Sequence, residues 1–160
     1  MSWPAEIRQT GLRPQFVDVI DITPTVLDIA GIPAPPVFAG VCQMPMQGKS
    51  IRPTFNNPKS PPPRDRQYYE LWGSRGIWHD GWKAIGMHTP GTNFDQDHWR
   101  LYHVAEDFSE SIDLAAKHPE KLEELKKLWW KEAAGNGALP LLEAPAARRA
   151  TYNQALPPPG

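Results

Sequence analysis

The sequence predicts an α+β fold, in which a small antiparallel four-stranded sheet packs with one C-terminal helix. Aromatic, alternating runs fill residues 67–104, an Asp-Gly pair separates two of these runs, and a helical period begins at Pro119. The chain has 19 prolines in 160 residues, where average usage of about 5% would give about 8. Because proline fixes φ and lacks an N–H donor, regular structure is expected between the proline clusters at 33–36, 58–63 and 157–159.

The first apolar block predicts a helix. Residues 16–20 indicate a short strand or the approach to a helix, and a short helix is expected from Asp21 to Gly31. Asp21 or Thr23 can cap its start, Pro24 suits its first turn, and Gly31 suits the position just past its end. The apolar side chains that share one face of this helix are Ile22, Val26 and Ile29, with Leu27 beside them.

The middle of the chain predicts the sheet. Residues 32–66 are proline-rich and indicate a long irregular connection between two layers. The pair Asp80-Gly81 predicts a two-residue hairpin turn, because both residue types tolerate positive φ. Tryptophans 72, 78, 82 and 99 are expected to supply much of the packing area of the sheet. Strands are expected at 67–72, 75–79, 82–85 and 98–104.

The clearest helical pattern follows the sheet. It begins at Pro119, and Gly135 and Gly137 are expected to end it. Glu123 and Lys127 are spaced as an i,i+4 pair, which adds about 0.2–0.5 kcal/mol. The apolar face is formed by Leu122, Leu125, Leu128, Trp129 and Ala133. The tail over 138–160 has no clear period and is expected to be irregular.

Charge and cysteine content exclude several classes. The net charge of −1 argues against a nucleic-acid or anionic-membrane partner, and no apolar stretch is long enough to span a bilayer. Cys42 is the only cysteine, so no internal disulfide is possible. The first residues lack the pattern of a signal peptide, which favours the cytoplasm for an intact chain. In a fragment, cytoplasm and periplasm both stay open.

Five short segments occur together, at 20–31, 48–50, 67–70, 75–83 and 101–115. The first reads Ile-Asp-Ile-Thr-Pro-Thr-Val-Leu-Asp-Ile-Ala-Gly, and the second reads Gly-Lys-Ser. The fourth begins Arg-Gly-Ile and ends Gly-Trp-Lys. In this order and spacing they resemble the type I sulfatases, and the run from Pro14 to Ala134 is most similar to the bacterial arylsulfatase branch.

The resemblance implies a domain division and an activity. Residues 1–58 would be a remnant of the large N-terminal α/β sulfatase domain plus a linker, 59–137 the C-terminal sheet-and-helix subdomain, and 138–160 a tail. The parent enzyme would hydrolyse aryl sulfate esters through a calcium-assisted formylglycine. The implied partners are the missing N-terminal sulfatase domain and, for the parent, an aryl sulfate.

The residues needed for this chemistry are not found. Formylglycine forms in the family from a Cys/Ser-x-Pro-x-Arg motif, and Cys42 fails it because Pro45 comes one position late with no arginine behind it. Ser60-x-Pro62-x-Arg64 matches in letters, but it leads into a strand and comes too late in the family order. We interpret it as a coincidence. The sequence therefore predicts no catalytic, cofactor-binding or metal-binding residue here, with calcium confined to the parent family.

Two weaker candidates have plain alternatives. Asp95, Asp97, Glu106 and Asp107 form a loose acidic stretch, which is better explained as a solvated loop face than as a calcium loop, because EF-hand spacing is absent. His79, beside the Asp-Gly turn, could border a substrate pocket in an assembled sulfatase, although an exposed turn residue is the simpler interpretation.

Two functions stay open at this point. The first is a C-terminal fragment of an arylsulfatase, inactive by itself. The second is a non-catalytic binding or complementation module that pairs with a separate N-terminal sulfatase chain, or binds a carbohydrate through its aromatic residues. In the first case the apolar face of the helix at 21–30 lacks its natural partner, so residues 1–60 are expected to pack poorly while 67–134 hold together.

Overall fold

The computed structural model describes residues 3–143, and the chain divides into two units, one ending at Asp65 and the other beginning at Arg66. The predicted irregular tail over 138–160 lies outside the described residues from position 144 onward. In the part of the chain that is described, no helix is both long and apolar enough to cross a bilayer.

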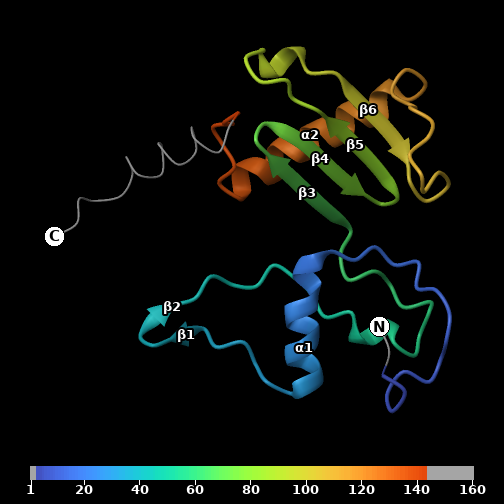
Figure 1. Cartoon of the computed structure of the whole chain (residues 1–160), viewed down its shortest axis with the longest axis vertical. Helices are drawn as coiled ribbons and strands as arrows, with labels where there is room; N and C mark the ends of the chain where they lie inside the picture. Colours follow the sequence, from blue (N-terminus) through green and yellow to red (C-terminus); the bar gives the residue numbers. More distant parts are fainter. Residues whose placement is uncertain (1–2, 144–160) are drawn as a thin grey trace. The chain divides into compact units, whose positions relative to one another are not determined.

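The second unit contains a four-stranded antiparallel sheet (Figure 1). Its strands follow chain order across the sheet, so every connection joins neighbours. Tyr68, Ile77, Ala84 and Leu101 pair across the four strands in one row, which aligns their side chains on the same face. The strands are β3 (Arg66–Leu71), β4 (Ser74–His79), β5 (Trp82–Gly86) and β6 (Trp99–His103).

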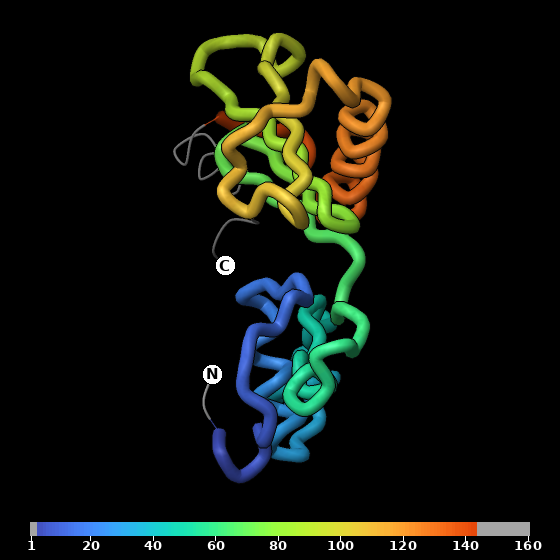
Figure 2. Tube along the Cα trace, turned by 90° about the vertical axis from the view of Figure 1, so that its right-hand side faces the viewer, coloured from blue at the N-terminus to red at the C-terminus, as the bar shows by residue number. Residues whose placement is uncertain are grey.

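Helix α2 (Pro119–Gly135) covers this face, and the view in Figure 2 shows it as a separate layer beside the sheet. Of the five residues that its apolar period predicts, the helix buries Leu125, Trp129 and Ala133, while Leu122 and Leu128 pack against this core and are partly buried. The indole of Trp129 also donates a 2.9 Å hydrogen bond to the carbonyl of Tyr69. The hydrophobic residues with no exposed surface, among those described, are Ile77, Ala84, Leu101, Leu125, Trp129 and Ala133. The predicted fold class, a four-stranded antiparallel sheet with a C-terminal helix, is confirmed.

Two-residue turns connect β3 to β4 and β4 to β5. Asp80 and Gly81 have φ of 47° and 81°, as the sequence predicts. A second turn at Trp72 and Gly73, with φ of 52° and 87°, lies where the sequence predicted the end of a strand. Trp72 is therefore 48% exposed and supplies little packing area, whereas Trp78 and Trp99 are buried. The error arose because the alternating aromatic pattern continues through a residue that forms the turn.

The first unit is built around α1 (Ile22–Ala30), which the sequence predicted. A 3₁₀ turn, η1 (Val19–Asp21), precedes it, and the side chain of Asp18 caps that turn. The Asp21 side chain does not accept an N–H from the first turn of α1 and instead accepts the N–H of Asp18, and Thr23 lies within the helix. The remaining elements are β1 (Val37–Phe38), β2 (Val41–Cys42) and η2 (Arg52–Thr54), with η3 (Phe94–Gln96) in the second unit.

Polar contacts hold the first unit together. Phe55 is its one buried hydrophobic residue among those described, whereas Asp21, Thr25 and Arg64 are buried polar side chains. Ile22 and Val26 on α1 remain more than half exposed. The expected apolar face of this helix therefore exists, and the described residues of the first unit do not cover it.

Candidate functional site

The Ser-x-Pro-x-Arg match does not form a reactive site. The Arg64 side chain is buried and pairs with the carboxylate of Asp21. Ser60 lies in a turn, where its amide donates to the carbonyl of Asn57 over 3.0 Å and its carbonyl accepts from the Gln15 side chain over 2.7 Å. The guanidinium that would contact a sulfate is thus committed to another partner.

Asp21 is the polar centre of the first unit. Its carboxylate accepts the backbone N–H of Asp18 over 2.9 Å and that of Lys49 over 2.8 Å, in addition to the guanidinium of Arg64. Burial alone would raise the pKa of Asp21. The two backbone donors and the arginine outweigh it and hold this pKa below its ordinary value. The ionised carboxylate of Asp21 ties α1 to the segments at 49 and 64.

Cys42 lies on β2 and is exposed as a free cysteine. Strand β2 pairs with β1 in a short hairpin. The other residues of the two strands, Val37, Phe38 and Val41, are also exposed. Nothing in this hairpin places a base or a cation beside the sulfur. Cys42 is thus an exposed residue of a short hairpin, and the expectation that 32–66 is irregular throughout was wrong at this point.

The acidic stretch does not gather into a metal site. Asp97 contacts Arg75, Glu106 lies 3.1 Å from the imidazole of His103, and Asp107 accepts the backbone N–H of Ile112 over 2.9 Å. Hydrogen bonding from Ile112 lowers the pKa of Asp107, which keeps this loop carboxylate ionised. Across residues 3–143, no group of three or more His, Cys, Asp or Glu side chains is arranged to hold a metal ion.

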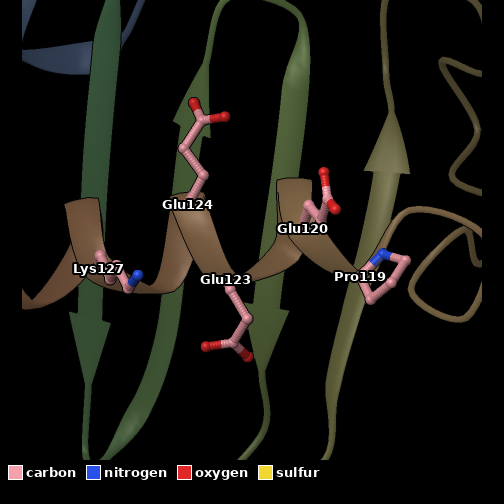
Figure 3. A pocket seen from close by; sticks show the side chains of 5 residues that line it. All are labelled: Pro119, Glu120, Glu123, Glu124 and Lys127. Atoms are coloured by element: carbon pink, nitrogen blue, oxygen red, sulfur yellow. The ribbon is translucent and has the colours of Figure 1, made fainter.

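His79 lies at the end of β4 with its side chain 28% exposed. Its Nδ1 is buried without a hydrogen bond and lies 3.9 Å from the carboxylate of Glu124 on α2. The same helix carries a shallow hollow lined by Pro119, Glu120, Glu123, Glu124 and Lys127 (Figure 3). The side chains of Glu123 and Glu124 point in opposite directions there, so the acids do not converge on one ligand position. Glu123 pairs with Lys126 over 2.6 Å.

A second hollow lies beside the β5–β6 end of the sheet. Trp82 stacks on His103 with ring centroids 4.3 Å apart and meets His118 edge-on at 5.5 Å. Its charged lining residues are Glu106, Asp107 and Lys117. Both imidazoles therefore occupy space beside the indole that a stacking sugar would need.

The second unit contains a buried network of charged side chains that the sequence did not predict. The guanidinium of Arg75 on β4 pairs with Asp97, and the carboxylate of Asp97 also lies 3.0 Å from Nδ1 of His88. These three side chains are 2%, 3% and 0% exposed. The rings that surround the Arg75 guanidinium, with centroids 5.1–5.9 Å away, are Phe94, Trp99, Trp129 and Trp130. Residues 75, 88 and 97 show no motif spacing, and only the fold brings them together.

Comparison with known proteins identifies a family for this arrangement. A family model described as "N-sulphoglucosamine sulphohydrolase, C-terminal" matches residues 1–134. An uncharacterised sulfatase of Schizosaccharomyces pombe is 32% identical over 142 residues, which cover 87% of this chain and 25% of that protein. The chain thus spans about a quarter of the length of this curated relative.

Solved structures share the fold. BT4656, determined in complex with its substrate D-glucosamine-2-N,6-O-disulfate, superposes with a TM-score of 0.52 at 23% identity, covering 75% of this chain and 24% of that one. Ps i-CgsB superposes with a TM-score of 0.52 at 19% identity, covering 90% of this chain and 30% of its own. At such identities the likeness establishes the fold alone.

Proposed function

Because the chain belongs to the C-terminal family of N-sulphoglucosamine sulphohydrolases, we propose that it forms the non-catalytic C-terminal part of a sulfatase, a sulfuric ester hydrolase. The match over residues 1–134 carries this proposal, because it runs through both units. The 32% identity to a fungal sulfatase supports the same assignment.

The partner in this proposal is an α/β sulfatase domain. The relatives are about four times longer than the segment they share with this chain, so most of a sulfatase lies outside it. Ile22 and Val26 present an apolar face that the described residues of the first unit leave exposed. Surfaces of this kind are typical of protein interfaces. We place the contact with the sulfatase domain on this face of α1.

The reacting groups in this proposal lie on that partner domain. A formylglycine would supply the nucleophile, and calcium would neutralise the sulfate oxygens. The described residues of this chain do not fit a calcium ion, since their carboxylates are separately engaged. The chain would support the sulfatase domain through its sheet and helix and would make no bond to the reacting atoms.

For the substrate, two sulfate classes compete. The resemblance of the sequence to the bacterial arylsulfatase branch suggests an aryl sulfate. The description of the family model and the substrate of BT4656 both indicate a sulfated amino sugar. Both substrate classes are derivatives of sulfuric acid, and the family assignment supports a substrate of this general kind. Of the two, we favour the amino sugar.

The coding sequence upstream of this chain provides the test. We expect a reading frame with a Cys/Ser-x-Pro-x-Arg motif there, and we expect the joined protein to release sulfate with calcium present. Parallel assays with 4-nitrocatechol sulfate and with glucosamine-2-N,6-O-disulfate separate the two substrate classes. A distant start with no such frame would contradict the proposal and favour an independent binding module.

A further inference from the structure

One imidazole in the second unit stands between two carboxylates from different segments. Nδ1 of His88 lies 3.0 Å from both oxygens of Asp97 in the same β5–β6 connection. Nε2 of His88 lies 3.5 Å from Oε1 of Glu143, which follows α2. The His88 side chain is fully buried, whereas that of Glu143 is 37% exposed. His88 thus links a loop to the segment after the terminal helix.

The surroundings of this imidazole define its charge balance. Arg75 on β4 pairs with Asp97 from the other side, and Glu70 on β3 caps the adjacent turn by accepting the N–H of Gly73 over 3.0 Å. The flat face of the imidazole stacks on Phe94 at 4.1 Å, without a charge. Asp97 and Glu143 therefore face the ring directly, and the single guanidinium of Arg75 compensates only one of them.

The nitrogen that faces Glu143 lacks a hydrogen-bond partner. Nε2 of His88 is a buried atom without one. When Nδ1–H donates to Asp97, a neutral imidazole leaves Nε2 as an acceptor pointing at a carboxylate, which is also an acceptor. A second proton converts this mismatch into a charge-assisted contact and balances the uncompensated carboxylate.

We propose that His88 and Glu143 form a pH-dependent contact, which we call the clasp, between the segment 138–143 and the loop that joins β5 and β6. As an imidazolium, His88 holds the segment 138–143 against the loop between β5 and β6, and as a neutral ring it gives up this contact, so that Glu143 keeps only its other attachment to the loop. Glu143 has a second attachment in the same loop, since Oε2 accepts the N–H of Gly91 over 2.9 Å. The clasp is therefore closed when the His88 ring carries both protons and loosened when it carries one.

The test follows the backbone of the clasped segment by NMR in the full chain. We expect the heteronuclear NOE of the Leu141 and Glu143 amides to fall between about pH 5.5 and about pH 8.5. In Glu143→Gln, which removes the charge at constant shape, these values become equal at the two pH values. The matched control Glu106→Gln changes an exposed carboxylate beside His103. It keeps the response of the wild-type chain.

Two results would overturn the clasp. The first is a heteronuclear NOE in the wild-type segment that does not change with pH. The second is a pH response that persists in Glu143→Gln, because another group would then be the switch. Imidazole ¹⁵N shifts, assigned by loss of one signal in His88→Gln, report the protonation of His88 in the same samples. Glu143→Gln keeps the test valid if His88→Gln does not fold, since the Glu143 side chain is partly exposed.

Discussion

Asp21 shows at the level of one residue how the first unit is held. Its carboxylate joins α1 to the segments around residues 49 and 64, in a unit whose buried side chains are mostly polar. Thr25 extends this link, because its hydroxyl donates to the Asp21 carbonyl and accepts the N–H of Ile51 over 3.0 Å. The polar network takes the place of an apolar core.

Asp21→Asn is expected to destabilise the first unit. The substitution leaves the buried guanidinium of Arg64 without its countercharge, which costs about 3–5 kcal/mol. Amide hydrogen exchange at Ile51 measures the free energy of unfolding of this unit. The control is Asp28→Asn, whose carboxylate forms an exposed pair with Arg52, and we expect a much smaller loss there. Equal losses in the two variants would contradict the central role of Asp21.

The same carboxylate predicts an acid limit for the first unit. Its pKa in the folded chain lies below the ordinary value of 3.8. Its contribution to stability is therefore fully present above that ordinary value and is lost as the pH falls through the folded pKa. We expect the Lys49 amide to stay protected at about pH 5 and to lose protection below about pH 4. Unchanged protection down to pH 2 would contradict this.

Glycines in β4 and β5 form a test at the level of strands. A Cβ added to Gly86 would lie 2.7 Å from the ring of buried Trp99, whereas one added to Gly76 would meet its nearest atom at 3.7 Å. We expect Gly86→Ala to destabilise the second unit by about 1–3 kcal/mol, because the packed indole has to move. Gly76→Ala should be close to neutral. Urea unfolding followed by tryptophan fluorescence compares the two, and a reversed order would contradict the packing described.

Elements with a strong local signal could be predicted from the sequence. The period from Pro119 to Gly135 indicates α2, and Asp80-Gly81 indicates the hairpin turn. The turn at Trp72 and Gly73 was missed because Trp72 continues the aromatic alternation of the strand and is a residue type that favours strands. The cap of the first helix was also misassigned, since Asp18, Asp21 and Thr23 are all capable of capping.

The functional groups were less accessible to sequence reasoning. The match at Ser60 and Arg64 was recognised as a coincidence from its position, and the pairing of Arg64 with Asp21 supports that interpretation. The network of Arg75, His88 and Asp97 could not be predicted, because its members are distant in sequence and belong to different elements. Pairing of this kind depends on tertiary structure and leaves no local pattern.

At the level of the whole molecule, the two units are expected to differ in resistance to protease. The second unit has a continuous apolar core, and the first relies on polar contacts and exposes apolar side chains on α1. Limited proteolysis with mass spectrometry should show early cuts within residues 1–60 and a persistent product containing 67–134. Early cleavage within 67–134 with 1–60 left intact would contradict the prediction.

The central claim is that this chain is a non-catalytic part of a sulfatase. Its most direct test is sulfate release by the purified chain alone, with calcium present and with 4-nitrocatechol sulfate and glucosamine-2-N,6-O-disulfate as substrates. We expect no release above the background without protein, and Cys42→Ala and Ser60→Ala should behave identically. Sulfate release that is abolished by Ser60→Ala or Cys42→Ala would contradict the claim, because it would place the nucleophile within this chain.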